Sequence, residues 1–315
     1  MIVLLNHQSD LDGIGSQAIL KRYFHNQGAQ LELKYALYPT FIERIQEVMA
    51  LDPDEIVIAD IGFNDSFNQV FPIFEAAMKK GIKIFWFDHH QVDEETQNRL
   101  KKTINLYKND TTSCAAKIVF EHFLPNDSIA QEIAKFAYDA DYNEKKFPIA
   151  QELQIVIANN RNDLTKLKKI SDLLSKGLFE DKFIQDERIK ALNEENEQIR
   201  NIKQNYEEFS IAKGKSLVLS YSNYSASKIS RILEAKYPSK YLYFGLDERS
   251  DEVVIRSNFI NCKALAKRFG GGGHFGRAGF SSNEILIIKN ENDTKKIKIN
   301  ENFINKFIIA VKEEL

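Results

Sequence analysis

The stretch IVLLNHQSDLDG, residues 2–13, begins with four apolar residues and ends with two aspartates and a glycine. A short apolar run bounded by polar residues is typical of a buried strand. The segment that follows, Ile14–Gln27, has apolar residues at helical spacing. We therefore predict a strand, a polar turn and a helix, which together form the first half of a βαβ unit.

This alternation of short apolar runs and helix-period segments continues to about residue 110. It predicts right-handed crossovers, which place helices on both faces of one sheet. The predicted fold class is therefore α/β, with a doubly wound, mainly parallel sheet and a smaller C-terminal α/β domain. Strands are predicted at Ile2–Leu5, Leu31–Tyr38, Glu55–Ala59 and Lys83–Phe87, and helices at Ile14–Gln27, Phe41–Leu51 and Ser66–Lys80, with Ser66 as N-cap and Gly81 as C-terminal stop.

After Thr111 the pattern becomes mostly helical, and a long polar segment, Phe183–Phe209, then carries only a narrow apolar stripe. Such a stripe is typical of a helix that bridges two bodies. We therefore predict a first domain over residues 1–182, a helical linker over 183–210 and a second domain over 211–315. The further predicted elements are helices at Ser113–Phe123, Ser128–Ala140, Gln151–Ala158, Ala226–Lys236 and Cys262–Arg268, strands at Ser216–Ser220, Tyr241–Leu246 and Glu252–Ser257, and a terminal hairpin and helix.

Composition excludes several classes of protein. The 43 Lys and Arg residues against 45 Asp and Glu leave a formal charge of −2, which disfavours a protein that coats long duplex nucleic acid. Cys114 and Cys262 are far apart and belong to no zinc motif, so we expect buried thiols in a reduced compartment. Apolar runs are too short to cross a bilayer. We expect a cytoplasmic protein with no membrane partner.

Acidic and histidine residues gather where three predicted strands end. The segments are His7-Gln8-Ser9-Asp10-Leu11-Asp12, then Asp60, then Asp88-His89-His90. In an open parallel sheet these ends meet at the crevice beside the topological switch point. The first segment alone could be an ordinary turn and Asp60 a helix cap, but two adjacent histidines behind a buried strand need partners. Together they predict one site.

Carboxylates brought so close would repel one another and take up protons unless cations neutralised them. The sequence therefore predicts a metal site. Mixed Asp and His ligands favour Mn²⁺, Co²⁺, Fe²⁺ or Zn²⁺ over Mg²⁺, and Mn²⁺ is our choice. Two such ions roughly 3.5–4 Å apart can hold a hydroxide in line with a phosphoryl group, so we predict two divalent ions and phosphoester hydrolysis.

These segments resemble the successive motifs of the DHH phosphoesterase superfamily. Phe269-Gly270-Gly271-Gly272-Gly273-His274 resembles the GGGGH signature of the DHH-associated C-terminal domain, so the resemblance spans almost the whole chain. It implies metal ligands at Asp10, Asp12, Asp60, Asp88 and His89, with Asp60 bridging two ions, catalytic roles for Asp60, Asp88 and His90, and approach of His90 to the phosphate.

Two positions depart from the pattern or leave a choice open. His7 precedes Asp10 by three residues, where many relatives have four, and a one-residue slip on an extended segment reverses the direction of a side chain. We retain His7 as a metal ligand. A further Asp is expected from Tyr138-Asp139-Ala140-Asp141-Tyr142. We prefer Asp139, with Asp141 as the alternative.

In the second domain the glycine run lets backbone N–H groups approach a phosphate without interference from a Cβ. Charged side chains nearby can add contacts to a phosphate or carboxylate. The predicted substrate-binding residues are Arg256, Ser257, Gly271, Gly272, Gly273, His274 and Arg277.

Catalysis in one domain and phosphate capture in the other favour a short linear substrate. We therefore predict a nanoRNase-like phosphodiesterase that releases mononucleotides from short RNA or DNA oligonucleotides. The resemblance adds linear dinucleotides (pGpG, pApA), 3′,5′-bisphosphonucleosides (pAp) and a homodimer. The rivals are a RecJ-type single-strand exonuclease, an inorganic pyrophosphatase and a nucleotide-binding sensor without turnover.

Overall fold

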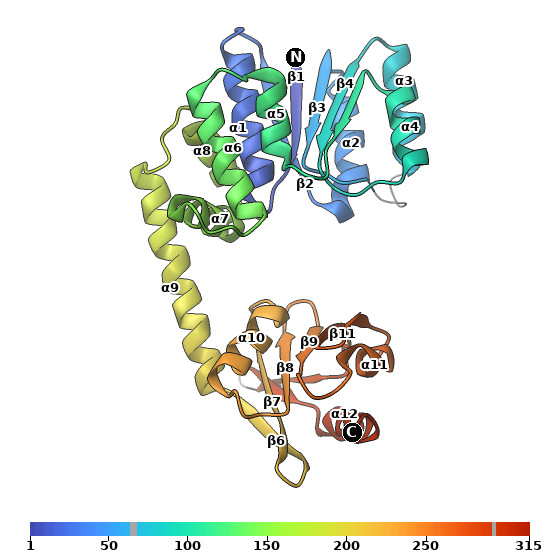
Figure 1. The fold of residues 1–315 in the computed structure, drawn as a ribbon, viewed down its shortest axis with the longest axis vertical. Coiled ribbons are helices and arrows are strands. Elements are labelled where there is room, and N and C mark those ends of the chain that lie inside the picture. The colour runs from blue at the N-terminus through green and yellow to red at the C-terminus, as the bar shows by residue number, and fades with distance from the viewer. Residues whose placement is uncertain (64–67, 292–293) are drawn as a thin grey trace. The chain divides into compact units, whose positions relative to one another are not determined.

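The computed structural model describes residues 1–63, 68–291 and 294–315. The chain divides into two compact units, Met1–Leu192 and Asn193–Leu315, which are described separately below (Figure 1). The predicted N-cap Ser66 lies outside the described residues.

The first unit is built on a five-stranded sheet in the order β2-β1-β3-β4-β5, with every neighbouring pair parallel. This order is one of the two common doubly wound arrangements, and its switch point lies between β1 and β3. The strands are β1 (Ile2–His7), β2 (Leu31–Ala36), β3 (Glu55–Ala59), β4 (Lys83–Asp88) and β5 (Leu106–Asn109).

Helices cover both faces of this sheet, as predicted (Figure 1). Successive residues of a strand pack into opposite cores: Leu4 and Val57 face the helices α1 and α5 to α8, whereas Val3 and Ile56 face α2, α3 and α4. Burial on both faces is why the strands are continuous apolar runs. The helices are α1 (Leu11–His25), α2 (Phe41–Ala50), α3 (Val70–Lys79), α4 (Glu94–Thr103), α5 (Ala115–Phe123), α6 (Ser128–Asp141), α7 (Pro148–Asn160) and α8 (Leu164–Ser175).

Three elements of this unit were not predicted: α4, α8 and β5. Helix α4 is strongly polar and buries only Leu100, so it lacks a clear apolar stripe. Strand β5 has four residues and two of them are polar. The predicted strand to Tyr38 is too long, because a 3-10 turn, η1 (Tyr38–Thr40), follows β2 and contains a proline.

The long helix α9 (Lys182–Gln204) is shorter than predicted, since residues 207–209 belong to strand β6 (Glu207–Ala212). Phe209 pairs with Leu217 of the next strand. The last residues of the predicted helix therefore form an edge strand of the sheet in the second unit. Among the described residues, none of the helices combines the length and apolar character needed to cross a membrane.

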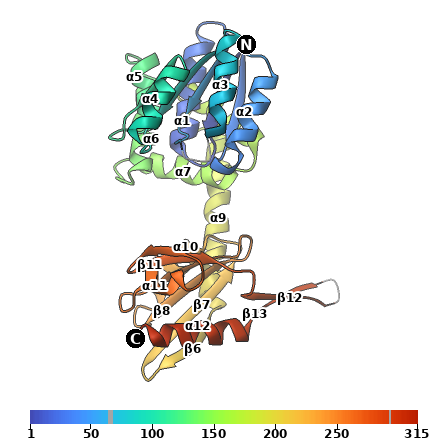
Figure 2. The ribbon, with the colours of Figure 1, turned by 90° about the vertical axis from the view of Figure 1, so that its right-hand side faces the viewer.

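The second unit contains a mixed six-stranded sheet in the order β10-β11-β9-β8-β7-β6 (Figure 2). Only β7 and β8 are parallel, and helix α10 connects them. The remaining elements are β7 (Lys215–Ser222), α10 (Ala226–Lys236), β8 (Leu242–Asp247), β9 (Glu252–Arg256), α11 (Cys262–Lys267), β10 (Gly272–His274), β11 (Arg277–Ser281), the hairpin β12 (Leu286–Glu291) and β13 (Thr294–Ile299), and α12 (Glu301–Glu313).

Candidate functional site

The predicted acidic segments meet at one edge of the first sheet. Strand β1 ends at His7, β3 is followed by Asp60, and β4 ends at Asp88, directly before His89 and His90. These three strands are neighbours and run parallel, so their carboxyl ends lie together. The edge coincides with the β1/β3 switch point, where doubly wound sheets bind ligands.

His7, Asp10 and Asp60 form the first group of facing ligand atoms. His7 Nδ1 lies 2.9 Å from Asp10 Oδ2 and 3.4 Å from Asp60 Oδ2. Asp10 is also the N-cap of α1, where its Oδ1 accepts a hydrogen bond from Gly13 N. The altered spacing of His7 therefore still directs its ring toward the acidic residues.

Asp12, His89 and Asp141 form a second group. His89 Nε2 lies 3.5 Å from Asp12 Oδ2, and His89 Nδ1 lies 3.7 Å from Asp141 Oδ2. Asp60 reaches this group as well, because its Oδ1 lies 3.4 Å from His89 Nε2. The two oxygens of Asp60 thus face the two groups, one each.

Asp60 sits in a costly environment. Its backbone φ is +59°, in the left-handed region that non-glycine residues seldom adopt. Its Oδ2 is buried and accepts no hydrogen bond from the described residues. Burial raises the pKa of the Asp60 carboxyl well above its usual range, and the charges of Asp10 and Asp12 raise it further. A buried carboxylate oxygen left in this state matches the chemistry of a metal ligand.

Neighbouring groups are perturbed by the same crowding. Burial alone would lower the pKa of His7, but the neighbouring carboxylates of Asp10 and Asp60 outweigh it and raise the pKa to about 10. Burial also raises the pKa of Asp12 to about 6, although the Ala116 amide and His89 oppose the change. The donor set of carboxylates and imidazoles suits a divalent transition metal.

Asp12 is placed by the start of α5. Its Oδ2 accepts a hydrogen bond from Ala115 N, and its Oδ1 accepts one from Ala116 N, each at 2.7 Å. Exposed N–H groups and the helix dipole favour an anion at this position. The amides of α5, about 100 residues later in the sequence, therefore fix the position of the Asp12 carboxylate on α1.

Asp88 contacts His90 instead of joining either group. Its Oδ1 lies 2.8 Å from His90 Nδ1, and its Oδ2 accepts a hydrogen bond from His90 N at 3.2 Å. The other ring nitrogen of His90 lies 3.0 Å from the hydroxyl of Tyr38, which also accepts a hydrogen bond from Gly62 N. A Cβ on Gly62 would lie 2.6 Å from the His90 ring, so glycine is required there.

Tyr38 was missed from the sequence, although it follows the end of β2 at the same edge of the sheet. The signal available was only its position after a strand. A single tyrosine before a proline is an ordinary turn, so this position carries little information.

Asp139 and Asp141, the two alternatives on α6, have different partners. Asp139 is buried, and its carboxylate accepts hydrogen bonds from Lys146 N and Phe147 N at 2.7 and 3.2 Å. It therefore holds the loop that leads to α7. Asp141 instead faces His89 and belongs to the second group of ligand atoms.

In the second unit, the glycine run has several different roles. Gly273 has a φ of +143°, and a Cβ there would lie 2.6 Å from Ala278 Cα. At Gly272, by contrast, a Cβ would meet open space. Gly271, His274 and Arg277 complete the hairpin β10–β11 or precede it. Backbone conformation thus gives Gly273 a reason of its own, and the role of the glycine run in ligand approach stays a prediction.

Arg256 and Arg277 lie directly opposite each other on the antiparallel strands β9 and β11. Like charges opposed in this way destabilise a sheet unless anions neutralise them, and Glu234 Oε2 lies 4.0 Å from Arg256 Nη1. Arg256 donates hydrogen bonds to Ser230 Oγ and Ser227 Oγ, and burial together with the charge of Arg277 lowers its pKa.

Ser257, another predicted ligand-binding residue, is buried. Its hydroxyl donates to Tyr241 O and accepts from Phe259 N and Ile260 N. These bonds engage the hydroxyl within the protein. These contacts shape the loop after β9, and binding of the substrate by Ser257 stays a prediction.

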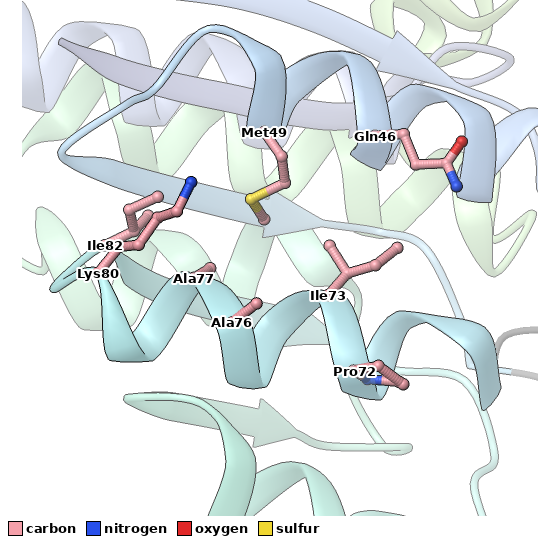
Figure 3. A pocket seen from close by; sticks show the side chains of 8 residues that line it. All are labelled: Gln46, Met49, Pro72, Ile73, Ala76, Ala77, Lys80 and Ile82. Carbon is pink, nitrogen blue, oxygen red and sulfur yellow. The ribbon is translucent and has the colours of Figure 1, made fainter.

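A separate hollow of about 410 Å³ lies between α2 and α3 (Figure 3). Met49 and Ile73 point toward each other across it, and the other lining residues are Gln46, Pro72, Ala76, Ala77, Lys80 and Ile82. None of the predicted site residues lines it. The candidate site therefore rests on the clustered charges alone.

The sequence model of the family described as "DHH family, N-terminal domain" matches residues 1–153. Residues 1–153 belong to the DHH family. The resemblance predicted from the motifs of the first unit is thereby confirmed. A comparison with curated protein sequences returned no match.

Solved structures of other proteins resemble the chain over nearly all of its length. The pGpG-specific phosphodiesterase PggH from Vibrio cholerae is 12% identical, with a TM-score of 0.53 over 100% of both chains. RecJ from Thermus thermophilus, in complex with Mn²⁺, is 15% identical with a TM-score of 0.54, over 99% of this chain and 51% of RecJ. At such identities the likeness shows the fold, and it confirms the predicted α/β class.

Proposed function

We propose that this DHH-family chain is a metal-dependent phosphodiesterase that hydrolyses short oligonucleotides, linear dinucleotides or pAp to mononucleotides. The observation that carries the proposal is Asp60, whose Oδ2 faces His7 beside Asp10 and whose Oδ1 faces His89, which has His90 and Asp12 beside it. A carboxylate in this position can be shared by two ions. Such ions, when bound, would supply a hydroxide nucleophile at neutral pH and stabilise the leaving oxygen.

We assign His7, Asp10 and Asp60 to one ion, and Asp60, Asp12, His89 and Asp141 to the other. Mn²⁺ is our choice for both. Asp141 replaces Asp139 in this assignment, because Asp141 Oδ2 faces His89 Nδ1 at 3.7 Å, whereas the Asp139 carboxylate faces the loop amides of Lys146 and Phe147.

We assign His90 to the substrate phosphate and Asp88 to the positioning of His90. The Asp88 carboxylate accepts a hydrogen bond from the Nδ1–H of His90, which orients the ring and directs Nε2 toward Tyr38. In its doubly protonated form, a ring oriented in this way can donate its Nε2–H to a phosphoryl oxygen that displaces the tyrosine hydroxyl.

The opposed Arg256 and Arg277, with His274, support binding of a second phosphate or of the substrate's end. The formal charge of −2 favours a short substrate over a long strand that needs an extended basic groove. A RecJ-type exonuclease remains the alternative, and this chain covers only 51% of RecJ.

The direct test is a product-release assay with the full chain on a 5-mer RNA, pApA, pGpG, pAp, pyrophosphate and a 40-mer single-stranded DNA. We expect mononucleotides from the 5-mer RNA, pApA, pGpG and pAp with Mn²⁺ and none with a chelator. Faster degradation of the 40-mer would favour the exonuclease. Nucleotide binding without hydrolysis of any substrate would instead identify a sensor.

A further inference from the structure

Phe259 and Phe275 are the two most exposed large apolar side chains among the residues that the structure describes, at 60% and 59%. A single exposed apolar residue is ordinary on a protein surface. Here, however, both belong to the second unit and both flank the predicted phosphate-binding residues. Phe275 directly follows His274, and Phe259 lies three residues after Arg256.

The two segments that carry these rings are joined to each other. The turn between β10 and β11 contains Phe275 and Gly276, and the loop from β9 to α11 contains Phe259. Ser257 N donates a hydrogen bond to Gly276 O at 3.2 Å, and Cys262 N donates one to Phe275 O at 2.7 Å. Both ends of the Phe259 loop are therefore bonded to the turn that carries Phe275.

Phe259 is held rigidly in its exposed position. Its backbone N–H donates to Ser257 Oγ at 3.0 Å. Its ring stacks on Tyr241 with 4.9 Å between centroids and 10° between planes, while more than half of its surface stays open. Because the ring is already ordered, a second flat ring can bind to it at little entropic cost.

Basic side chains flank the segments that carry the two rings. His274 and Arg277 pair across the β10–β11 hairpin that Phe275 closes, and Arg277 faces Arg256 on the next strand. Exposed aromatic rings beside positive charges are the combination that proteins use for nucleotides, since every base offers a π-face and every nucleotide a phosphate.

We propose that Phe259 and Phe275 form a nucleobase-stacking platform that receives a base of the substrate whose phosphate binds Arg277. The proposal rests on the proposed function and deepens it by defining the substrate as a nucleotide recognised by stacking. Recognition through a π-face predicts tolerance of base identity, with purines binding more tightly than pyrimidines because they offer more area.

Paired substrates provide the test. The full chain and the variants Phe259→Ala and Phe275→Ala are assayed on pApA and on its abasic counterpart, which keeps the phosphates and lacks the bases. Loss of stacking is worth about 5- to 150-fold per base. We expect the kcat/KM ratio of pApA over the abasic compound to fall by such a factor, and Phe275→Tyr to restore it.

Ile309→Ala provides the matched control, since Ile309 is 58% exposed on α12 of the same unit. An unchanged substrate ratio in both phenylalanine variants would overturn the platform while leaving the phosphodiesterase intact. Altered elution in size-exclusion chromatography with an unchanged ratio would identify the rings as a contact between copies of the chain, and would also overturn it.

A binding readout separates this inference from the proposed function. Trp86 is the one tryptophan of the sequence and is buried in the first unit, so Phe275→Trp adds a second, exposed fluorophore. We expect pApA, and not its abasic counterpart, to quench this fluorescence. Quenching without turnover would retain the platform and reject the phosphodiesterase, and equal signals from both compounds would reject the platform.

Discussion

The two units position charged residues by different means. In the first unit, β1, β3 and β4 are parallel, so residues after their carboxyl ends gather at one edge. In the second, the opposed Arg256 and Arg277 are brought together by the antiparallel register of β9 and β11. Parallel topology therefore brings the acidic residues together, and antiparallel register brings the two arginines together. A site at the ends of parallel strands can therefore be predicted from the order of strands in the sequence, whereas one that depends on antiparallel register cannot.

The largest loss of activity is expected on substitution of Asp60, because we propose that its carboxylate is shared by the two ions. Asp60→Asn should lower kcat by about 10³-fold or more, because loss of a direct ligand exceeds the 10- to 100-fold loss typical of outer-shell residues. Rates and bound metal are measured together by assay and elemental analysis.

Asp52→Asn is the matched control, since Asp52 is also an aspartate with positive φ, +49°, but is exposed and lies before β3. Retention of normal metal content and rate by Asp60→Asn would remove the connecting role from the account.

The next effect separates the two aspartates of α6. Asp141→Ala should lose metal and at least about tenfold in rate. Asp139→Ala should instead lower the free energy of unfolding by about 1–3 kcal/mol, because two amides lose their acceptor. Chemical denaturation and metal analysis of both variants provide the readouts. The reverse pattern would return the ligand role to Asp139.

A smaller effect is expected in the second unit. Arg277→Ala should raise KM by about 10- to 150-fold with little change in kcat, since a charge-assisted contact contributes about 1.5–3 kcal/mol. Arg249→Ala is the control, because Arg249 pairs with Asp247 at the other end of β8 and β9. A fall in kcat with constant KM would place Arg277 in the chemical step.

The glycine run offers a matched pair. Gly273→Ala should destabilise the chain by about 1–3 kcal/mol, because alanine is strained at a φ of +143°. Gly272→Ala should leave stability unchanged, as its Cβ would meet open space. Thermal unfolding measures both. Equal loss in the two variants would show that backbone conformation does not distinguish them.

The smallest effect concerns Asp127, which caps α6 and accepts hydrogen bonds from Arg22. Burial alone would raise the pKa of Asp127, but these bonds hold it below its usual value. Asp127 therefore stabilises the folded chain at pH values above the pKa that it has in the unfolded chain. This stabilisation is lost as the pH falls through the lower pKa that it has in the folded chain. Asp127→Asn should cost under about 1 kcal/mol at pH 7 and nothing near pH 2. A cost independent of pH would exclude the ion pair as its source.

Much of the first unit was predictable because its strands are buried on both faces. Glu55–Ala59 was predicted with both boundaries correct, since an apolar run between polar residues admits few alternatives. Helix α4 and strand β5 were not predictable in the same way, because α4 is polar and largely exposed, and β5 has only four residues, two of them polar.

The candidate site divides similarly. Strand ends predicted that His7, Asp60 and His89 would meet, because parallel topology alone brings them together. The engagement of Asp88 with His90, and of Asp139 with the amides of Lys146 and Phe147, depends on side-chain directions that spacing does not specify. The buried hydroxyl of Ser257 was unpredictable for the same reason.

If Asp60 is shared by two ions, the two ions should be magnetically coupled to each other, and this coupling can be measured. Electron paramagnetic resonance of the full chain loaded with Mn²⁺ should show an exchange-coupled pair at two ions per chain, replaced in Asp60→Asn by uncoupled Mn²⁺. Binding of a single ion, or of two magnetically isolated ions, to the wild-type chain would contradict the account.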